Sequence, residues 1–398
     1  MSGLDYIFNK NELTNELTSI IIRNKETDNM CDISLANSIR RALYTTSGCY
    51  SFNYEMTKEQ KNIYNNYFNT KFPEDEVVFS VSYDNYYNKQ TFAHRLTLIP
   101  LYYSDETRYI FEEGLYVLLT DAADFSKPYI NKNSEPKYIY TNDLRFMRLN
   151  KSTDTMEDIT PEEKKMLIKF NIPFVILLKD NGIHMIGNPQ YNIGYAGGHY
   201  EPVCIQYNFG QNSTPTYERR DNFDNPKNIE IIVEFNGMKE LKLAVNDSYK
   251  FLILQLESIK THYNLAQSNS SDIIKIENNE IGVQNIKINS TDELYLADHT
   301  MGNLLESHLI YTLYDLLSEY KHDFDELYRY TLISYVSPDL SLINRFITIK
   351  YQIPPAQGFL DFVGTKLNCA TDLISVKQRI FISVCNNLIA YYNKIMIV

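Results

Sequence analysis

Few residues in the sequence combine the type and the spacing that catalysis requires. Asp298 and His299 are adjacent, and a carboxylate beside an imidazole can form a general base or part of a metal site. No second histidine follows four residues after His299, where a metal site on a helix would place it. Asp298 also precedes an apolar run, as the N-cap of a helix does, and this role accounts for both positions. A free-standing hydrolase using Asp298 and His299 is therefore kept as an alternative.

Other motifs that indicate a reactive or ligand-binding site are missing from the sequence. The segment GYAGG, at Gly194 to Gly198, lacks the lysine and the spacing of a phosphate-binding loop. Neither G-x-S-x-G nor H-E-x-x-H occurs. No C-x-x-C pair is formed by the cysteines, which are Cys31, Cys49, Cys204, Cys369 and Cys385. We therefore expect no catalytic residue, no metal and no cofactor.

The composition is typical of a globular protein with an acidic surface. The chain has 398 residues, 44% of them hydrophobic, and a formal net charge of −12. This length favours two or three domains. The negative charge argues against a surface that binds phosphates directly, so DNA and RNA would be contacted only through other chains. The polar N-terminus, the scattered cysteines and the lack of an apolar run of membrane length predict an intracellular protein with no membrane partner.

One sequence pattern occurs twice, at 32–43 (DISLANSIRRAL) and at 298–309 (DHTMGNLLESHL). Both copies begin with Asp and a Ser or Thr, which favour helix starts, and both continue with apolar residues at helical spacing. We predict two amphipathic helices, and in the first we place Ser38 and Arg41 on the polar face. The repetition alone is compatible with coincidence or with a pseudo-symmetric pair. The apolar positions are Leu35, Ala36, Ile39 and Leu43, and Met301, Leu304, Leu305 and Leu309.

A similar order of elements is predicted on both sides of a linker at 264–272. Before the linker we predict strands at 17–23 and 77–83, a helix or loop at 54–72, a short helix at 91–99 stopped by Pro100, and irregular chain at 102–163. Further strands are predicted at 166–178, 200–207, 228–235 and 241–245, with Asp247 capping a helix to about 263. After the linker we predict strands at 282–288, 332–336 and 346–352, and a closing helix from about 371.

Two pairs of motifs carry a resemblance to a known family. ISLANSIRRAL, followed by FAHRLTLIPL at 92–101, resembles the third-largest subunit of eukaryotic RNA polymerase II, the archaeal D subunit and the N-terminal domain of bacterial α. ADHTMGNLLESHL at 297–309, with YVSPDL at 335–340, resembles their partner, the eleventh or archaeal L subunit. The chain thus resembles both partners fused head to tail, as in polymerases of large cytoplasmic DNA viruses. The match covers both ends well and the middle weakly.

The resemblance implies an α+β fold in which two α-like dimerisation units form a pseudo-dimer within one chain. The expected divisions are 12–50 with 206–268 for the first unit, 51–205 for a mixed β domain inserted in it, and 272–398 for the second unit. The apolar faces of the two repeated helices would then contact each other. Several features depart from the family: the zinc-binding cysteines are missing, Thr97 replaces a glycine, and 318–330 has no counterpart.

The implied function is a non-catalytic assembly platform of a DNA-directed RNA polymerase. Its partners would be the largest and second-largest subunits and two small subunits, in host cytoplasm and virion if viral, and in the nucleus otherwise. The resemblance assigns docking of the large subunits to Arg40, Arg41, His94 and Arg95, although the arginines also suit a solvated helix face and His94 alone suits a structural role. An adaptor unrelated to transcription is a further alternative.

Overall fold

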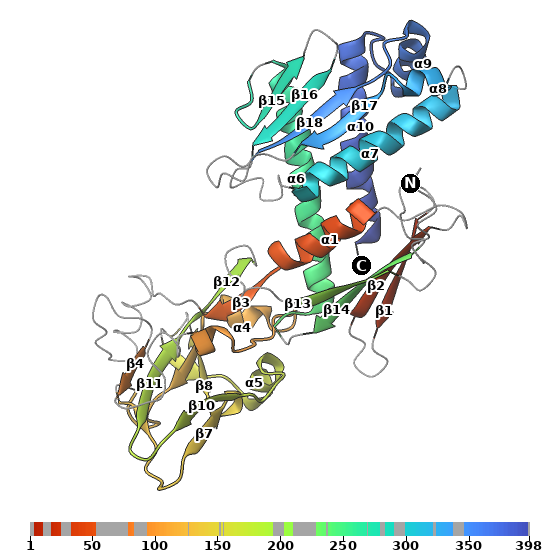
Figure 1. Cartoon of the computed structure of the whole chain (residues 1–398). Helices are drawn as coiled ribbons and strands as arrows, with labels where there is room; N and C mark the ends of the chain where they lie inside the picture. Colours follow the sequence, from red (N-terminus) through yellow and green to blue (C-terminus); the bar gives the residue numbers. More distant parts are fainter. Residues whose placement is uncertain are drawn as a thin grey trace.

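The computed structural model describes residues 4–10, 17–24, 33–52, 79–82, 94–193, 203–209, 228–235, 238–336 and 346–396, with internal gaps at 126, 151–152, 154, 269, 279–282, 290–298 and 321–323. These residues form a mixed α+β structure, which confirms the α+β part of the predicted fold class. No helix in these ranges is long and apolar enough to span a membrane. Figure 1 shows an elongated molecule with long helices through its centre and a separate β-rich region at one end.

The first sheet joins strands from both sides of a long excursion of the chain. Its order is β1 (Leu4–Lys10), β2 (Leu17–Asn24), β14 (Asn228–Phe235) and β13 (Val203–Phe209), and every neighbouring pair is antiparallel. Helix α1 (Ile33–Thr45) follows β2 and contacts β13 and β14. Helix α6 (Leu241–Gln267) follows β14. The predicted strands at 17–23 and 228–235 are confirmed, whereas β1 was not predicted.

The second sheet repeats this order in the C-terminal part of the chain. It runs β15 (Ile274–Asn278), β16 (Gln284–Asn289), β18 (Phe346–Gln352) and β17 (Leu332–Val336), again antiparallel throughout. Helix α7 (His299–Tyr320) follows β16 and contacts β17 and β18. Helix α8 (Phe324–Tyr328) precedes β17, and α9 (Gln357–Leu367) precedes the closing helix α10 (Leu373–Ile395). We call β1 to α6, without the region between α1 and β13, the first segment, and β15 to α10 the second segment. Apart from the short helices α8 and α9, both segments follow the order strand, strand, helix, strand, strand, long helix.

One hydrophobic core joins the helices of both segments. Residues of α1, α6, α7 and α10 and of the second sheet belong to a single buried cluster. Helices α6 and α10 lie side by side in Figure 1 and contact each other along their lengths. Tyr249 near the start of α6 stacks on Tyr392 near the end of α10, and Tyr263 near the end of α6 stacks on Phe381. These pairings make the two helices antiparallel.

The β-rich region between α1 and β13 has a core of its own. It begins with β3 (Gly48–Phe52) and ends with β12 (Pro189–Ile193), which pair with each other. Between them lies a six-stranded antiparallel sheet of β4 (Phe79–Ser82), β11 (Gly182–Gly187), β5 (Leu115–Leu119), β8 (Arg145–Asn150), β9 (Thr155–Asp158) and β6 (Tyr129–Ile130). Strands β7 (Lys137–Tyr140) and β10 (Pro173–Leu177) pair separately, and the helices are α4 (Arg108–Glu112) and α5 (Pro161–Leu167). We call residues 48–193 the inserted region.

Local sequence signals explain several element starts. Helix α5 begins with a capping box, in which the Thr160 hydroxyl accepts from the Glu163 backbone N–H and the Glu163 carboxylate accepts from that of Thr160. Pro161 occupies the first helical position, where its missing N–H costs nothing. Asp372 caps α10 by accepting from the backbone N–H groups of Ile374 and Ser375. The predicted closing helix from about 371 is thus confirmed.

Several predictions of secondary structure are wrong or only partly right. The chain at 102–163 is not irregular, because it forms β5 to β9, α4 and the start of α5, and all five side chains of β5 are buried. The stretch at 241–245 is the first turn of α6 and not a strand, so Asp247 lies inside the helix and does not cap it. The supposed linker at 264–272 begins within the last turn of α6. The stretch at 166–178 is only partly strand, since α5 extends to Leu167 before β10 begins.

The remaining predicted elements mostly agree with the structure. The strands at 77–83, 200–207, 282–288, 332–336 and 346–352 correspond to β4, β13, β16, β17 and β18. Of the short helix predicted at 91–99, residues 94–97 are helical. The predicted helix or loop at 54–72 lies outside the described residues, as do Asp32 and Asp298, the predicted caps of the repeated helices.

Candidate functional site

The eight apolar residues predicted for the repeated helices are all buried in the shared core. Each of them has an exposed fraction of 0%, and α1 and α7 contact each other directly. Complete burial of a Leu, Ile or Met side chain contributes about 1.5–3 kcal/mol through the hydrophobic effect. The α1–α7 contact is therefore a principal link between the two segments. These residues are Leu35, Ala36, Ile39 and Leu43 of α1, and Met301, Leu304, Leu305 and Leu309 of α7.

Ser38 corrects the predicted polar face of α1. It is fully buried, although its position on the helical wheel placed it with the solvent-facing residues. Its hydroxyl lies 2.7 Å from the Tyr392 hydroxyl of α10 and 2.6 Å from the Leu35 carbonyl oxygen. The Tyr392 side chain of α10 reaches this side of α1, so the Ser38 hydroxyl has a partner in place of water. Ser38 thus provides a polar link between the first and second segments.

Helix α7 packs closely on its own sheet at Gly302. A Cβ atom at this position would lie 2.5 Å from ring atoms of Tyr335 in β17, which is too close for any side chain. One turn later, the Glu306 carboxylate accepts a 2.9 Å hydrogen bond from the Tyr335 backbone N–H. Burial raises the pKa of Glu306, and this hydrogen bond opposes the shift. The Glu306 carboxylate therefore joins α7 to β17, the edge strand of the second sheet.

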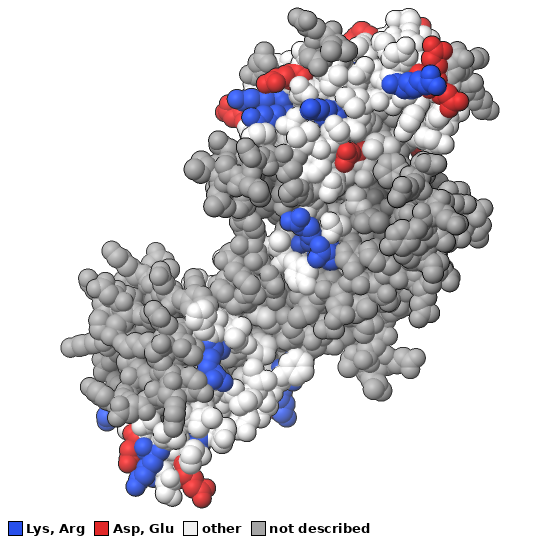
Figure 2. Space-filling model, viewed as in Figure 1, with Lys and Arg blue, Asp and Glu red and all other residues white. Residues whose placement is uncertain are grey.

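The four residues predicted to dock large subunits lie on two different parts of the fold. Arg40 and Arg41 are half-buried on α1, and Arg40 donates to the Asn37 side chain. Figure 2 shows basic side chains over α1, and these arginines are the basic residues of that helix. His94 is exposed and Arg95 half-buried on a helical turn whose Leu96 belongs to the core of the inserted region. The four residues therefore form two separate candidate docking surfaces, one on α1 with Arg40 and Arg41 and one on the inserted region with His94 and Arg95.

Of the two residues of the alternative hydrolase, His299 is the first residue of α7. Asp298 and GYAGG lie outside the described residues, and only the backbone of His299 is described. Within the described ranges, no group of three or more His, Cys, Asp or Glu side chains is placed to hold a metal ion. The cysteine thiols at Cys49 and Cys385 are buried, and burial raises the pKa of each to about 12. Neither thiol is ionised near neutral pH, so neither suits nucleophilic chemistry.

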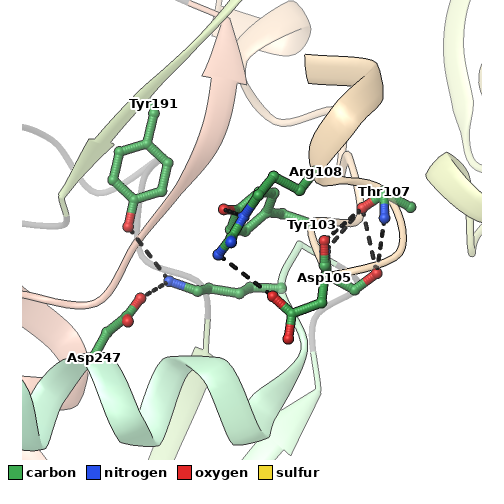
Figure 3. Close-up of polar contacts among 8 residues, drawn as sticks. Tyr103, Asp105, Thr107, Arg108, Tyr191 and Asp247 are labelled. Carbon is green, nitrogen blue, oxygen red and sulfur yellow. Dashed lines mark hydrogen bonds and ion pairs between the residues drawn. The ribbon is translucent and has the colours of Figure 1, made fainter. Parts of the chain in front are cut away.

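A buried lysine that the sequence did not reveal joins the inserted region to α6. Lys239, between β14 and α6, has an exposed fraction of 0%. Its Nζ atom donates to the Gly48 carbonyl oxygen at 2.6 Å, to Asp247 Oδ2 at 2.5 Å and to the Tyr191 hydroxyl at 3.5 Å. Figure 3 shows Tyr191 and Asp247 reaching this ammonium from different elements. We call Lys239, Gly48, Asp247, Tyr191 and Tyr103 the lysine joint.

Tyr103 completes the lysine joint through its backbone and its ring. Its N–H donates to the Met238 carbonyl oxygen and its carbonyl oxygen accepts from the Glu240 N–H, both at 2.9 Å. The Lys239 ammonium lies 5.8 Å from the centre of the Tyr103 ring, within reach of a cation–π interaction. No pattern in the sequence indicated a role for Lys239. Lysine side chains are seldom fully buried, so an exposed Lys239 is the ordinary expectation.

Comparison of the sequence with models of known protein families gave no match, and comparison with curated proteins gave none either.

Proposed function

We propose that this chain is a non-catalytic assembly platform of a multisubunit DNA-directed RNA polymerase, built as a dimer of α-like units within one polypeptide. One observation carries the proposal: two segments with the same order of strands and helices, and the same sheet order, meet through equivalent helices α1 and α7. Two of the motifs that carry the resemblance lie on these segments, since ISLANSIRRAL forms most of α1 and the second repeat begins α7.

The single chain has a simple physical advantage for such a platform. When two units are separate, each exposes the apolar face of its helix and they dissociate on dilution. Linking them makes the association intramolecular, at an effective concentration of up to about a millimolar. Helices α6 and α10 extend the contact beyond α1 and α7, and ring stacking between Tyr263 and Phe381 at 4.3 Å contributes to it.

The two docking surfaces supply the partner contacts in this proposal. Arg40 and Arg41 would pair with carboxylates of one large subunit, because the planar guanidinium binds carboxylates through two parallel hydrogen bonds. His94 and Arg95 would meet another partner at the inserted region. In α7, Glu306 aligns with Arg40 but bonds to Tyr335 of its own sheet. The equivalent surfaces of the two units therefore differ in charge, which suits two different large subunits.

Co-expression with the two largest polymerase subunits from the same source tests the proposal. Replacing Arg40 and Arg41 with alanine should reduce recovery of the complex about tenfold, equivalent to about 1.4 kcal/mol. The matched control is the double variant Lys242→Ala and Lys250→Ala, which removes the same charge from α6 and should leave recovery unchanged. Circular dichroism of both variants should show the wild-type melting curve. Equal recovery of all three proteins would contradict the docking surface on α1.

A pull-down from the native source tests the broader assignment. The intact chain should recover both large subunits and small polymerase subunits. Recovery of other proteins without any polymerase subunit would contradict the proposal and favour an adaptor unrelated to transcription. Turnover by the isolated chain that is lost on replacing His299 would favour the hydrolase instead.

A further inference from the structure

The lysine joint holds a charge where a charge is costly. A buried ammonium group is tolerated when its donors are bonded and an anion lies beside it. Lys239 meets both conditions, because its three N–H donors face three oxygen atoms and one of these belongs to the Asp247 carboxylate. The ring of Tyr191 lies 5.6 Å from the ammonium and that of Tyr103 lies 5.8 Å from it. No donor remains for a ligand, so the group is not a binding or catalytic site.

The partners of Lys239 come from three separate elements of the chain. Gly48 is the first residue of β3, where the chain leaves α1, and Tyr191 lies in β12, where the inserted region ends. Asp247 lies in the second turn of α6. Cys49 and Met238 form a small buried cluster beside these groups. A single side chain thus contacts both ends of the inserted region and the helix next to it.

We infer that Lys239 is a positioning residue that fixes the orientation of the inserted region relative to α6, and through the shared core relative to α1. Apolar contacts accept small rotations, because they have no preferred direction. Three hydrogen bonds from one ammonium to oxygens on different elements do not accept such rotations, since each bond has a narrow range of length and angle. The inference concerns the isolated chain and does not depend on the proposed polymerase function.

The two ionised partners differ in exposure, and this difference makes the inference testable. Asp247 is 33% exposed at its side chain, whereas Lys239 is 0% exposed. Removing Asp247 leaves the buried Lys239 ammonium with only neutral oxygen partners. An unpaired buried cation is costly, so the ammonium is expected to move toward water and distort the lysine joint. Removing the lysine leaves a carboxylate that water can reach. Asp247→Ala should therefore lower the melting temperature more than Lys239→Met does, whereas each change removes hydrogen bonds that fix the orientation.

The experiment measures the orientation by distances between two spin labels on the full chain. The labels are introduced as unnatural amino acids at Tyr138 of the inserted region and Leu254 of α6, which are 53% and 65% exposed. The wild-type chain should give one narrow distance distribution. Asp247→Ala should broaden or shift it, and Lys239→Met, which removes all three hydrogen bonds of the ammonium, should do so as well; a wild-type distribution in folded Lys239→Met would overturn the inference. Glu257→Ala is the matched control, because it removes the partner of Lys260 on the surface of the same helix and should change nothing.

Melting curves separate orientation from stability. A folded Asp247→Ala chain with the wild-type distance distribution would overturn the inference, even with a lowered melting temperature, because the pair would then only stabilise the start of α6. If Asp247→Ala fails to fold, Lys239→Met supplies the test alone. A broadened distribution in folded Lys239→Met supports the inference, and an unchanged one overturns it.

Discussion

Helices α1 and α7 share an apolar pattern but differ in the polar residues they bury. In the alignment of the two repeats, Ser38 of α1 corresponds to Leu304 of α7, and Arg40 corresponds to Glu306. Ser38 bonds to Tyr392 of α10, whereas Leu304 packs in the apolar core. Arg40 lies on the surface with Asn37, whereas Glu306 bonds to the sheet beneath its helix. The apolar pattern brings the helices together, and the polar differences distinguish the two sides of the contact.

The largest difference between the helices is expected at the aligned pair Ala36 and Gly302. Gly302→Ala should lower the free energy of unfolding by about 2–3 kcal/mol, because the new methyl group overlaps the Tyr335 ring and the helix must move away from β17. Urea denaturation measures this effect. Ala36→Gly is the matched control, which should cost about 1 kcal/mol through backbone entropy and lost apolar contact. A smaller loss in Gly302→Ala than in Ala36→Gly would contradict the close packing of α7 on its sheet.

Short-range spacing was enough to predict the shared apolar pattern. Leu35 and Ile39, like Met301 and Leu305, are four residues apart, and all four are buried as their period requires. The same reasoning failed at Ser38, whose burial depends on a residue 354 positions away in the sequence. Helical spacing identifies a face of a helix, but it does not identify which other elements cover the remaining faces.

The start of α6 shows why local signals also misassign an element. The alternation of Leu241, Lys242 and Leu243 has the period of a strand, and Asp247 has the type of a helix cap. Leu241, Ala244 and Val245 are instead buried at helical spacing against the shared core. The Asp247 carboxylate accepts a hydrogen bond from the buried Lys239 ammonium of the lysine joint. Tertiary contacts therefore overrode both signals, and the lysine joint as a whole has no pattern that a sequence could reveal.

A second prediction compares two buried hydroxyl groups in the helical core. Ser38→Ala should lower the free energy of unfolding by about 1–2 kcal/mol, because it removes a hydrogen bond from the buried Tyr392 hydroxyl. Tyr249→Phe should be neutral or stabilising by up to about 1 kcal/mol, because the Tyr249 hydroxyl has no hydrogen-bond partner within the described residues. Denaturation of both variants, with Tyr392→Phe to complete the cycle for Ser38, measures the difference. Equal losses of stability in Ser38→Ala and Tyr249→Phe would contradict a specific contribution from the hydrogen bond between α1 and α10.

The smallest predicted effect concerns the aligned pair Arg40 and Glu306. Burial raises the pKa of Glu306 in the folded chain, so the folded state holds this proton more tightly than the unfolded state does. The contribution of Glu306 to stability is therefore fully present below the unfolded pKa of about 4.3 and declines as the pH rises through the folded pKa. Glu306→Gln keeps an oxygen for the Tyr335 N–H and removes the titration.

Relative to wild type, Glu306→Gln should consequently be more stable at pH 7 than at pH 4, as measured by urea denaturation at both values. Arg40→Gln should show no such change, because a guanidinium does not titrate in this range. If the stability advantage of Glu306→Gln over wild type shrinks as the pH rises, the hydrogen bond from β17 lowers the pKa of this carboxylate more than burial raises it. Glu306 would then stabilise the edge of the second sheet as an anion, and the charge difference between α1 and α7 would contribute to folding as well as to partner choice.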